Sequence, residues 1–344
     1  MAGLCAAARA RQLGLRPIVL EKGDRPGGSM LLSSGVVWRH GSLEDFRREC
    51  PGGDERLQQA IVDRLDEALA WLESLGAPVL ARETRNPRTV GWRFEPLGLT
   101  EALVRAAGGE FELGRPLDDG IETRPLVLAT GGFPVRLAQL WSLPLRATAW
   151  SEGDGLDYAR ARGAVATEGM EEFYGRAMPA PPAQWAEPEF VDHAQLYGQV
   201  ARVLDERGEE IRVDPEDWSE NGLVQEIARR GGTAWYVVEA ADLVEPTPYG
   251  TVAEAIERAR LVGGTVEQRD DGATAVHVVA AVTHTIGGIA VDERARVLRE
   301  DGSVVDGLYA AGVDAGGIAT GGYASGLAAG LVFGLIAGEE AAAT

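Results

Sequence analysis

The sequence is poor in cysteine, histidine and basic residues. Only 2 cysteines and 4 histidines occur in 344 residues, and they show no spacing typical of a metal site or a disulfide framework. Lysine and arginine number 33 against 53 aspartates and glutamates, which gives a net charge of −20. Because phosphate binding needs clusters of basic residues, this composition argues against a nucleic-acid partner. We predict no metal site. The N-terminus has no charged and apolar segments typical of a secretory leader, so we expect a cytoplasmic protein.

The overall composition is that of a globular enzyme. Hydrophobic residues make up 45% of the chain and charged residues 25%, and the length suggests about two domains. The stretch 315–338 carries no charge and has small residues at regular spacing, which also allows a membrane span. Its glycine and polar content is high for about 20 spanning residues, so we expect no membrane partner.

Glycine is abundant, and it gathers near the C-terminal end. Residues 307–327 read GLYAAGVDAGGIATGGYASGL, the pattern of a strand, a turn and a helix start at which backbone approaches a bulky ligand. This pattern indicates a flavin. Beyond it, glycines recur at every fourth position (Gly326, Gly330, Gly334 and Gly338), so one face of the last helix is bare and can press against a neighbouring element.

The opening residues give part of a dinucleotide-binding unit. Residues 2–13 predict a helix that stops at Gly14, and residues 16–21 predict a short strand that ends in Glu21. Gly3 occupies the place of the third glycine of a G-x-G-x-x-G turn, and Glu21 that of the acid that binds ribose hydroxyls. The first strand and the two earlier glycines are absent. We therefore expect an N-terminally truncated chain, or a start codon placed too late, with weakened flavin binding.

Three internal segments give further expectations. Residues 54–75 predict an amphipathic helix that closes at Gly76. Residues 125–133 predict a buried parallel strand that enters a glycine turn. Residues 170–185 are rich in proline and aromatic residues, and we predict an ordered loop there that leads into another domain.

Six motifs together resemble the FAD-dependent fumarate reductase and succinate dehydrogenase flavoproteins, including the 3-ketosteroid dehydrogenases. They are the Gly3 to Lys22 arm, Gly27-Gly28-Ser29 with Ser33-Ser34-Gly35, Ala129-Thr130-Gly131-Gly132-Phe133, Gly153-Asp154-Gly155, His284-Thr285-Ile286-Gly287-Gly288, and Ala310-Ala311-Gly312. Their order and spacing make the resemblance specific. It covers about the first 75 residues, about the last 65 and the stretch around 125–175 well, and the remainder loosely.

The resemblance implies an α/β fold: a Rossmann-type FAD-binding domain built from both chain ends, with an inserted α+β capping domain that the family folds over the isoalloxazine ring. We place the first part of the FAD-binding domain at 1–158, the capping or substrate domain at 159–276 and the C-terminal part of the FAD-binding domain at 277–344.

The same resemblance assigns the residues that bind the cofactor. For Ser29 and Ser34 the alternative is a purely structural role as turn caps, and for Glu21 it is a solvated strand end. The predicted FAD-binding residues are Gly3, Glu21, Lys22, Gly27, Gly28, Ser29, Ser34, Gly35, Thr130, Gly131, Asp154, Gly312, Asp314, Ser325, Gly326 and Leu327.

Three residues are the catalytic candidates. His284 stands where the family places a histidine that hydrogen-bonds substrate, although a histidine satisfied by backbone is the plainer interpretation. The Asn-Arg pair with which fumarate reductases clamp a carboxylate is replaced here by Gly322 and Tyr323. Tyr323 resembles the tyrosine turn of the ketosteroid dehydrogenases, or forms a wall of the flavin pocket. Arg269 is the arginine nearest the usual acid–base position, and its alternative is a surface ion pair.

These features predict an FAD-dependent oxidoreductase acting on CH–CH groups. The resemblance implies hydride transfer between a substrate C–C bond and flavin N5, with a small-molecule substrate of enoate, dicarboxylate or ketone type and an unknown electron donor or acceptor. The alternative is a truncated, non-catalytic remnant of such a flavoprotein with an incomplete FAD site.

Overall fold

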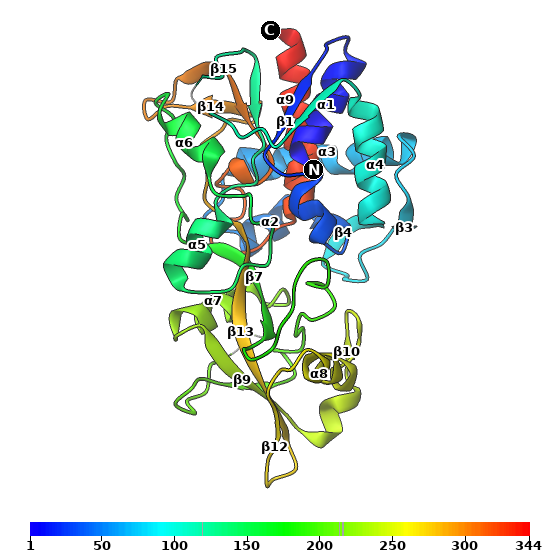
Figure 1. Ribbon diagram of the computed structural model, residues 1–344, viewed down its shortest axis with the longest axis vertical. Coiled ribbons are helices and arrows are strands. Elements are labelled where there is room, and N and C mark those ends of the chain that lie inside the picture. The colour runs from blue at the N-terminus through cyan, green and yellow to red at the C-terminus, as the bar shows by residue number, and fades with distance from the viewer. Residues whose placement is uncertain (119, 213, 215–216) are drawn as a thin grey trace. The chain divides into compact units, whose positions relative to one another are not determined.

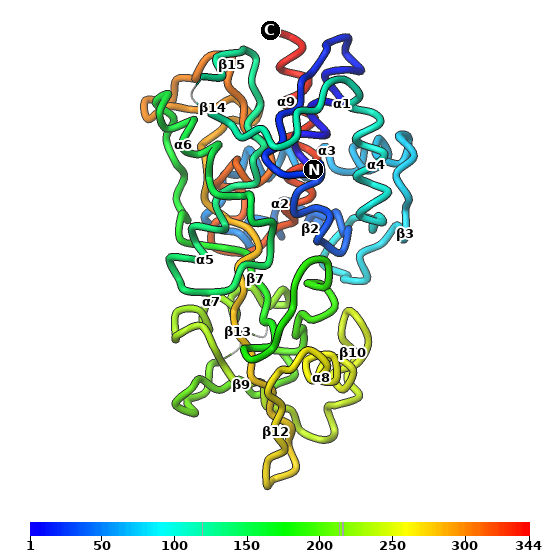
Figure 2. Tube along the Cα trace, viewed as in Figure 1, coloured from blue at the N-terminus to red at the C-terminus, as the bar shows by residue number. Residues whose placement is uncertain are grey.

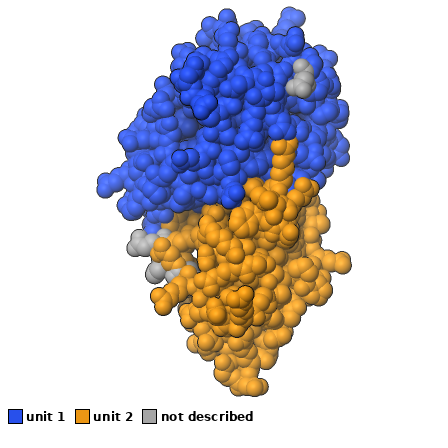
Figure 3. Space-filling view, turned by 90° about the vertical axis from the view of Figure 1, so that its left-hand side faces the viewer, with its two compact units in different colours: residues 1–135, 148–172, 284–344 blue, residues 136–147, 173–283 orange. Residues whose placement is uncertain are grey.

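The computed structural model describes residues 1–118, 120–212, 214 and 217–344, and its contacts divide the chain into two compact units (Figure 3). Unit 1 comprises residues 1–135, 148–172 and 284–344, and unit 2 comprises residues 136–147 and 173–283. Both chain ends thus belong to one unit. The boundaries differ from the expected ones at 158 and 276: unit 1 extends to residue 172, unit 2 extends to residue 283, and a short segment after residue 135 joins unit 2.

Unit 1 combines helices with three small sheets. Its elements are α1 (Ala2–Gln12), β1 (Ile18–Glu21), η1 (Gly28–Leu32), β2 (Val36–His40), α2 (Leu43–Glu49), α3 (Glu55–Ser74), β3 (Val79–Ala81), β4 (Thr89–Phe94), α4 (Pro96–Ala107), β5 (Glu110–Leu113), β6 (Leu126–Leu128), α6 (Asp154–Arg160), β14 (Arg296–Leu298), β15 (Val304–Ala310), η3 (Gly312–Asp314) and α9 (Gly326–Ala343). Helix α5 (Pro134–Trp141) begins in unit 1 and continues into unit 2.

Parallel pairing joins segments that are far apart in the sequence. Strand β1 pairs with β5 in parallel, with Ile18 opposite Glu110. Strand β6 pairs with β15 in parallel, with Leu126 opposite Leu308, and β14 adds an antiparallel edge to β15. Parallel strands run in the same direction, so the carboxyl ends of β6 and β15 lie side by side at the same edge of the sheet. The predicted strand at 125–133 is confirmed as the shorter β6.

The first and last helices of unit 1 lie side by side (Figures 1 and 2). The glycines of α9 make this packing close: a Cβ on Gly334 would stand 2.6 Å from the carbonyl oxygen of Ala2, and one on Gly338 would stand 2.6 Å from that of Ala6. The predicted bare helix face is therefore confirmed. By length and composition α9 also passes as a candidate membrane span, but 67% of its window is buried within the structure, as in the core helix of a globular unit.

Helix α3 matches the amphipathic helix expected beneath the first domain. It begins after Asp54, whose side chain accepts the backbone N–H of Arg56, and it ends at Ser74, followed by Leu75 and by Gly76, which adopts a φ of +84°. Its apolar stripe is almost fully buried, with Leu65 and Leu72 at 0% exposure. Capping and periodicity were both visible in the sequence, so both ends of α3 could be predicted.

Unit 2 is built around a five-stranded antiparallel sheet. Its elements are β7 (Phe173–Pro179), β8 (Arg202–Leu204), α7 (Asn221–Arg229), β9 (Thr233–Val238), η2 (Ala240–Val244), β10 (Pro246–Thr247), β11 (Gly250–Thr251), α8 (Val252–Leu261), β12 (Val266–Gln268) and β13 (Thr274–Thr285), whose last two residues belong to unit 1. The strand order is β12-β13-β9-β8, and β7 also pairs with β13.

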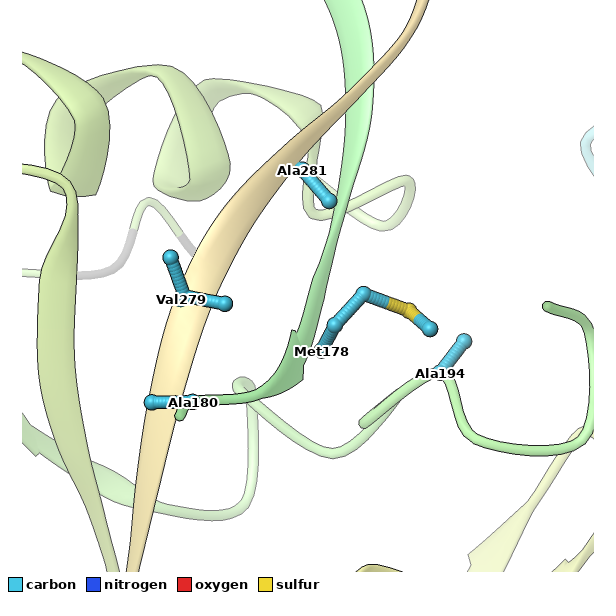
Figure 4. Packing of buried hydrophobic residues seen from close by; sticks show 5 residues of the cluster. All are labelled: Met178, Ala180, Ala194, Val279 and Ala281. Carbon is cyan, nitrogen blue, oxygen red and sulfur yellow. The ribbon is translucent and has the colours of Figure 1, made fainter. Parts of the chain in front are cut away.

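The prediction of a loop at 170–185 is wrong for residues 173–179. Residues 173–179 form strand β7, which the sequence hid because Gly175 and Pro179 interrupt the usual strand composition. Gly175 is required where it stands, since a Cβ there would lie 2.6 Å from the carbonyl oxygen of Ala281 on β13. The core beside these strands is a cluster in which Met178 of β7 reaches toward Ala194, and Val279 and Ala281 of β13 belong to the same cluster (Figure 4).

A buried acidic residue lies at the start of helix α7. Glu220 is 6% exposed and adopts a φ of +58°, which is strained for a residue other than glycine. Its Oε1 accepts the backbone N–H of Gln199 at 3.4 Å, and the fully buried Tyr236 lies near enough to interact with it electrostatically. Burial raises the pKa of Glu220 to about 7, against the opposing effect of the Arg176 guanidinium.

This burial makes the stability of unit 2 depend on pH. The raised pKa means that the folded state holds a proton on Glu220 which the unfolded state has released, so stability falls as pH rises from about 4.5 to about 7. We expect Glu220→Gln to abolish this loss and to make the protein more stable than wild type at pH 8, by up to about 3 kcal/mol at about 1.4 kcal/mol per pKa unit, with little difference at pH 4.5.

Urea unfolding of wild type, Glu220→Gln and the control Glu257→Gln, an exposed change on α8, at pH 4.5, 6 and 8 measures this effect. An identical pH profile for wild type and Glu220→Gln would contradict it.

Candidate functional site

The carboxylate of Asp314 organises the glycine turn that follows β6. Its oxygens accept N–H groups from three consecutive residues: Thr130, Gly131 (3.2 Å) and Gly132 (3.3 Å), and also the Thr130 hydroxyl (2.9 Å). Gly131 and Gly132 have φ values of +90° and +71°, which turn successive N–H groups toward one acceptor. Asp314 is 2% exposed, and burial raises its pKa despite these hydrogen bonds.

The Thr130 hydroxyl extends this arrangement to helix α6. It accepts the backbone N–H of Gly155 at 3.2 Å, and a Cβ on Gly155 would stand 2.8 Å from Asp314 Oδ1. The predicted FAD-binding residues Thr130, Gly131 and Asp314 therefore lie together. Asp314 uses both carboxylate oxygens to hold the turn, a role that the sequence analysis did not foresee.

Lys22, which follows strand β1, contacts two acidic residues at the start of α6. Lys22 Nζ contacts Asp154 Oδ2 at 2.9 Å and also the carboxylate of Glu152. Lys22 and Asp154, each predicted to bind the cofactor, are thus in direct contact with one another. Glu21 Oε1 accepts the N–H of Gly23 at 2.7 Å, and its side chain stays partly accessible, as a ribose-binding acid requires.

The Gly27-Gly28-Ser29 turn has open backbone on one side. Gly28 adopts a φ of +56°, and a Cβ built on it would meet nothing within 4 Å. Gly27, with a φ of +119°, is instead packed against Thr100 and the side chain of Leu31. Ser29 Oγ accepts the N–H of Thr148 at 3.2 Å. This contact ties the turn to a distant segment, while the space at Gly28 suits the approach of a ligand.

The neighbouring serine turn is held by hydrogen bonds between side chains and its backbone. The carbonyl oxygen of Ser34 accepts Nε–H of Arg93 at 3.2 Å, and the turn serine that caps Gly35 is Ser33, whose Oγ accepts the Gly35 N–H at 3.1 Å. Gly35 has a φ of +72°, and a Cβ there would overlap the carbonyl oxygen of Phe94. Gly35 is therefore required for the approach of β4, independently of any ligand.

At the C-terminal motif, small residues bring three elements together. Gly312 has a φ of +68°, and a Cβ there would stand 2.9 Å from that of Ala2 at the start of α1. Gly3 lies in the same helix turn, where a Cβ would stand 3.3 Å from Ala129. Ser325 caps α9 by accepting the N–H of Ala328 at 3.3 Å. Gly3 and Gly312 thus lie near the first turn of α1, whose N–H groups form an anion-binding end.

His284, on strand β13, lies beside the start of α9. A Cβ built on Gly326, which precedes Leu327 in the first turn of that helix, would stand 3.1 Å from His284 Nε2. His284 Nδ1 lies 3.1 Å from the carbonyl oxygen of Thr285. A carbonyl accepts only, so Nδ1 carries the proton and Nε2 the lone pair. Burial lowers the pKa of His284, which keeps the imidazole neutral at physiological pH.

The hydroxyl of Thr285 is buried without a partner among the described residues. It faces Gly132, where a Cβ would stand 2.5 Å from Thr285 Oγ1. An unpaired buried hydroxyl costs about 1–3 kcal/mol, so a polar atom supplied from outside the chain suits this position. Sequence analysis missed Thr285 because a threonine next to a histidine carries no signal of its own.

Tyr323 belongs to an aromatic cluster with strand β2. Its ring makes a T-shaped contact with Trp38, with centroids 5.4 Å apart, and its carbonyl oxygen accepts a hydrogen bond from His40 Nε2 at 3.3 Å. Burial lowers the pKa of His40 to about 4. These contacts favour the role of Tyr323 as an aromatic wall. Trp38 and His40 were missed, although the aromatic residues of β2 were visible in the sequence.

Arg269 is not brought to His284. It lies in the turn between β12 and β13, where its N–H donates to the carbonyl oxygen of Ala273, and Asp270 and Asp271 follow it at the surface. Strand β13 runs from Thr274 to Thr285, so Arg269 and His284 stand at opposite ends of a strand about 36 Å long at about 3.3 Å per residue. Arg269 was suggested as the arginine nearest the usual acid–base position, but strand β13 separates it from His284.

The described residues contain no group of three or more histidine, cysteine, aspartate or glutamate side chains that could hold a metal ion.

Comparison with known proteins gives a family match over nearly the whole chain. A family model described as "FAD binding domain" matches residues 1–108 and 116–327. Among curated relatives, the fumarate reductase of Schizosaccharomyces pombe is 43% identical over 84 residues, 24% of this chain and 16% of that protein. The NADH:acrylate oxidoreductase of Vibrio harveyi is 48% identical over 63 residues, 18% of this chain and 6% of that protein. The alignments thus span less than a fifth of these relatives.

Solved structures share the fold at low sequence identity. A flavocytochrome c3 fumarate reductase in its open conformation aligns with a TM-score of 0.70 at 19% identity, over 99% of this chain and 76% of that one. The 3-ketosteroid-Δ4-(5α)-dehydrogenase from Rhodococcus jostii RHA1 aligns with a TM-score of 0.71 at 19% identity, over 99% of this chain and 94% of that one. The α/β fold expected from the sequence is confirmed.

The Asp314 contacts predict the effect of one substitution. We expect Asp314→Asn to lower the free energy of unfolding by about 1–3 kcal/mol, because an amide cannot accept on both sides and leaves buried N–H groups unpaired. Hydrogen exchange should accelerate at Gly131 and Gly132. Asp306→Asn, an exposed change on the adjoining strand β15, serves as the control and should be neutral. Unchanged stability and exchange in Asp314→Asn would show that the turn does not depend on the carboxylate.

Proposed function

The chain belongs to the family described as FAD binding domain, and from that membership we propose that it is an FAD-dependent oxidoreductase acting on CH–CH groups. The cofactor of this family of FAD-binding oxidoreductases is FAD. Two neighbouring residues support the activity most directly. His284 is neutral and is oriented by its hydrogen bond to the Thr285 carbonyl oxygen. The buried hydroxyl of Thr285 faces the Gly132 turn and lacks a partner among the described residues.

The residues present fit FAD. The first turn of α1 with Gly3 and Gly312 suits the pyrophosphate, Glu21 suits the ribose, and the open backbone at Gly28 allows close approach. The Thr130 turn held by Asp314 and the Thr285 hydroxyl would supply further polar groups to it. When bound, FAD supplies a flavin that accepts or donates a hydride at N5.

The protein's contribution to the reaction lies in His284. The Nδ1–H bond to the Thr285 carbonyl oxygen fixes the tautomer and leaves the lone pair on Nε2. A neutral Nε2 accepts a hydrogen bond or a proton from a substrate group. A low pKa keeps it in this form, so the imidazole serves as a hydrogen-bond acceptor or base and not as a cation at neutral pH.

Tyr323 has two proposed roles. Its T-shaped contact with Trp38 supports the wall of a ligand pocket, and its phenol can donate a hydrogen bond to a ketone oxygen. The substrate class stays between an enoate or dicarboxylate and a ketone, because Gly322 and Tyr323 stand where the Asn-Arg pair of fumarate reductases is expected.

His284→Ala should lower turnover at least tenfold, about 1.4 kcal/mol of transition-state stabilisation, while the melting temperature stays near that of wild type. Turnover is measured on fumarate, acrylate and 4-androstene-3,17-dione with an artificial electron donor or acceptor. His277→Ala, on the same strand β13, is the control and should retain full turnover.

Two outcomes would count against the proposal. Unchanged turnover with a lowered melting temperature in His284→Ala would give His284 a structural role only. A wild-type protein that holds no flavin and turns over none of the substrates would instead favour the non-catalytic remnant.

A further inference from the structure

A short turn that ends at Glu172 lies against the His284 motif within unit 1. The N–H of Glu172 donates to the carbonyl oxygen of Gly169 at 3.0 Å, which closes the turn. The motif donates to the backbone of this turn twice. The N–H of Gly287 donates to the carbonyl oxygen of Gly169 at 3.1 Å, and that of Ile286 donates to the carbonyl oxygen of Glu172 at 3.1 Å. The backbone at Glu172 is therefore fixed next to the motif.

The side chain of Glu172 reaches from this turn to the C-terminal glycine loop. Its Oε2 accepts the N–H of Gly321 at 2.8 Å. Gly321 adopts a φ of +81°, which other residues rarely adopt, so a glycine is needed to aim this N–H at the carboxylate. A Cβ on Gly169 would stand 3.3 Å from Glu172 Oε1 and 3.2 Å from Thr320 Cγ2, so the carboxylate and Thr320 lie over the same glycine. Glu172 thus joins two segments that are distant in the sequence.

Gly321 begins the stretch that carries Tyr323 into helix α9. The far end of this stretch is fixed as well, because Ser325 caps α9 and Gly326 lies beside His284, where a Cβ would stand 3.1 Å from Nε2. Tyr323 therefore lies in a segment with both ends held against the His284 motif, one end through the Glu172 carboxylate and the other through Gly326. The Glu172 hydrogen bond is the side-chain contact that sets the first of these ends.

We propose that Glu172 is a positioning residue, whose carboxylate sets the place of Tyr323 relative to His284. The inference rests on the proposed function, in which Tyr323 and His284 both face the substrate. A hydrogen bond to a carboxylate is about twice as strong as one between neutral groups. Because a misplacement of about 1 Å can cost about a hundredfold in rate, one such bond at the start of the stretch is enough to affect the reaction.

Amide hydrogen exchange of Gly321, measured by NMR, tests the contact without flavin or substrate. Glu172→Ala removes the acceptor, and we expect exchange at Gly321 to accelerate at least about tenfold. Glu172→Gln keeps an acceptor oxygen at the same reach and should stay within about threefold of wild type. Glu172→Asp keeps the charge on a shorter side chain and should behave like Glu172→Ala, which it replaces if that variant does not fold. Glu171→Ala, an exposed change on the same turn, is the matched control and should exchange like wild type.

Turnover tests whether this placement serves the reaction. The assay uses whichever of fumarate, acrylate and 4-androstene-3,17-dione the wild type turns over. We expect Glu172→Ala to lower kcat at least about tenfold and to change KM less than about threefold, because the placement of Tyr323 matters most in the transition state. Glu172→Gln should restore most of kcat, and Glu171→Ala should turn over like wild type. If Glu172 acts through the phenol, adding Glu172→Ala to Tyr323→Phe causes no further loss.

Unchanged Gly321 exchange or unchanged kcat in Glu172→Ala would overturn the proposal. So would equal losses of kcat in Glu172→Ala and Glu172→Gln, or additive losses in the double variant. The proposed function fails in a different way, through a wild type that holds no flavin and turns over none of the three substrates. In that case faster Gly321 exchange in Glu172→Ala would leave the placement of Tyr323 by Glu172 standing, and unchanged exchange would overturn it too.

Discussion

The arrangement of the candidate site depends on one buried carboxylate. Asp314 follows β15, and its hydrogen bonds to Thr130, Gly131 and Gly132 tie the end of β15 to the turn after β6. The two strands are parallel neighbours. Without the Asp314 carboxylate as acceptor, the converging N–H groups of this turn would be buried and unpaired. The acceptor also faces Gly155, which brings the start of α6 to the same place. A single side chain thus holds three segments that are distant in the sequence.

Close packing of small residues extends this constraint to the helices. Gly312 lets the chain pass next to Ala2, and the glycines of α9 let that helix lie against α1. The first turn of α1, the Asp314 turn and the start of α9 beside His284 therefore belong to one rigidly packed unit. A preorganised set of N–H groups and one neutral imidazole is the type of scaffold that lets a cofactor, and not the protein, carry the difficult chemistry.

Local signals in the sequence were enough to predict the fold class and several elements of unit 1, but not the side-chain contacts of the site. The periodicity and caps of α3 fixed its ends, and the glycine spacing of α9 predicted its bare face. Strand β7 was missed because Gly175 and Pro179 mask a pairing that only β13 explains. The placement of Arg269 could not be predicted either, since nothing local shows that β13 carries it away from His284. Asp314 stays a predicted cofactor-binding residue. That its carboxylate oxygens also accept hydrogen bonds from the turn after β6 is a long-range relation that one sequence does not show.

Identification of the nucleotide bound by the purified protein tests the central claim most directly. The protein would be incubated with FAD, NAD and NADP together, freed of excess ligand and denatured, and the released nucleotide identified by chromatography and mass. The account predicts that FAD is released and that the bound form shows a flavin absorption spectrum that differs from that of free FAD. Release of NADP or NAD, or of no nucleotide at all, would contradict it.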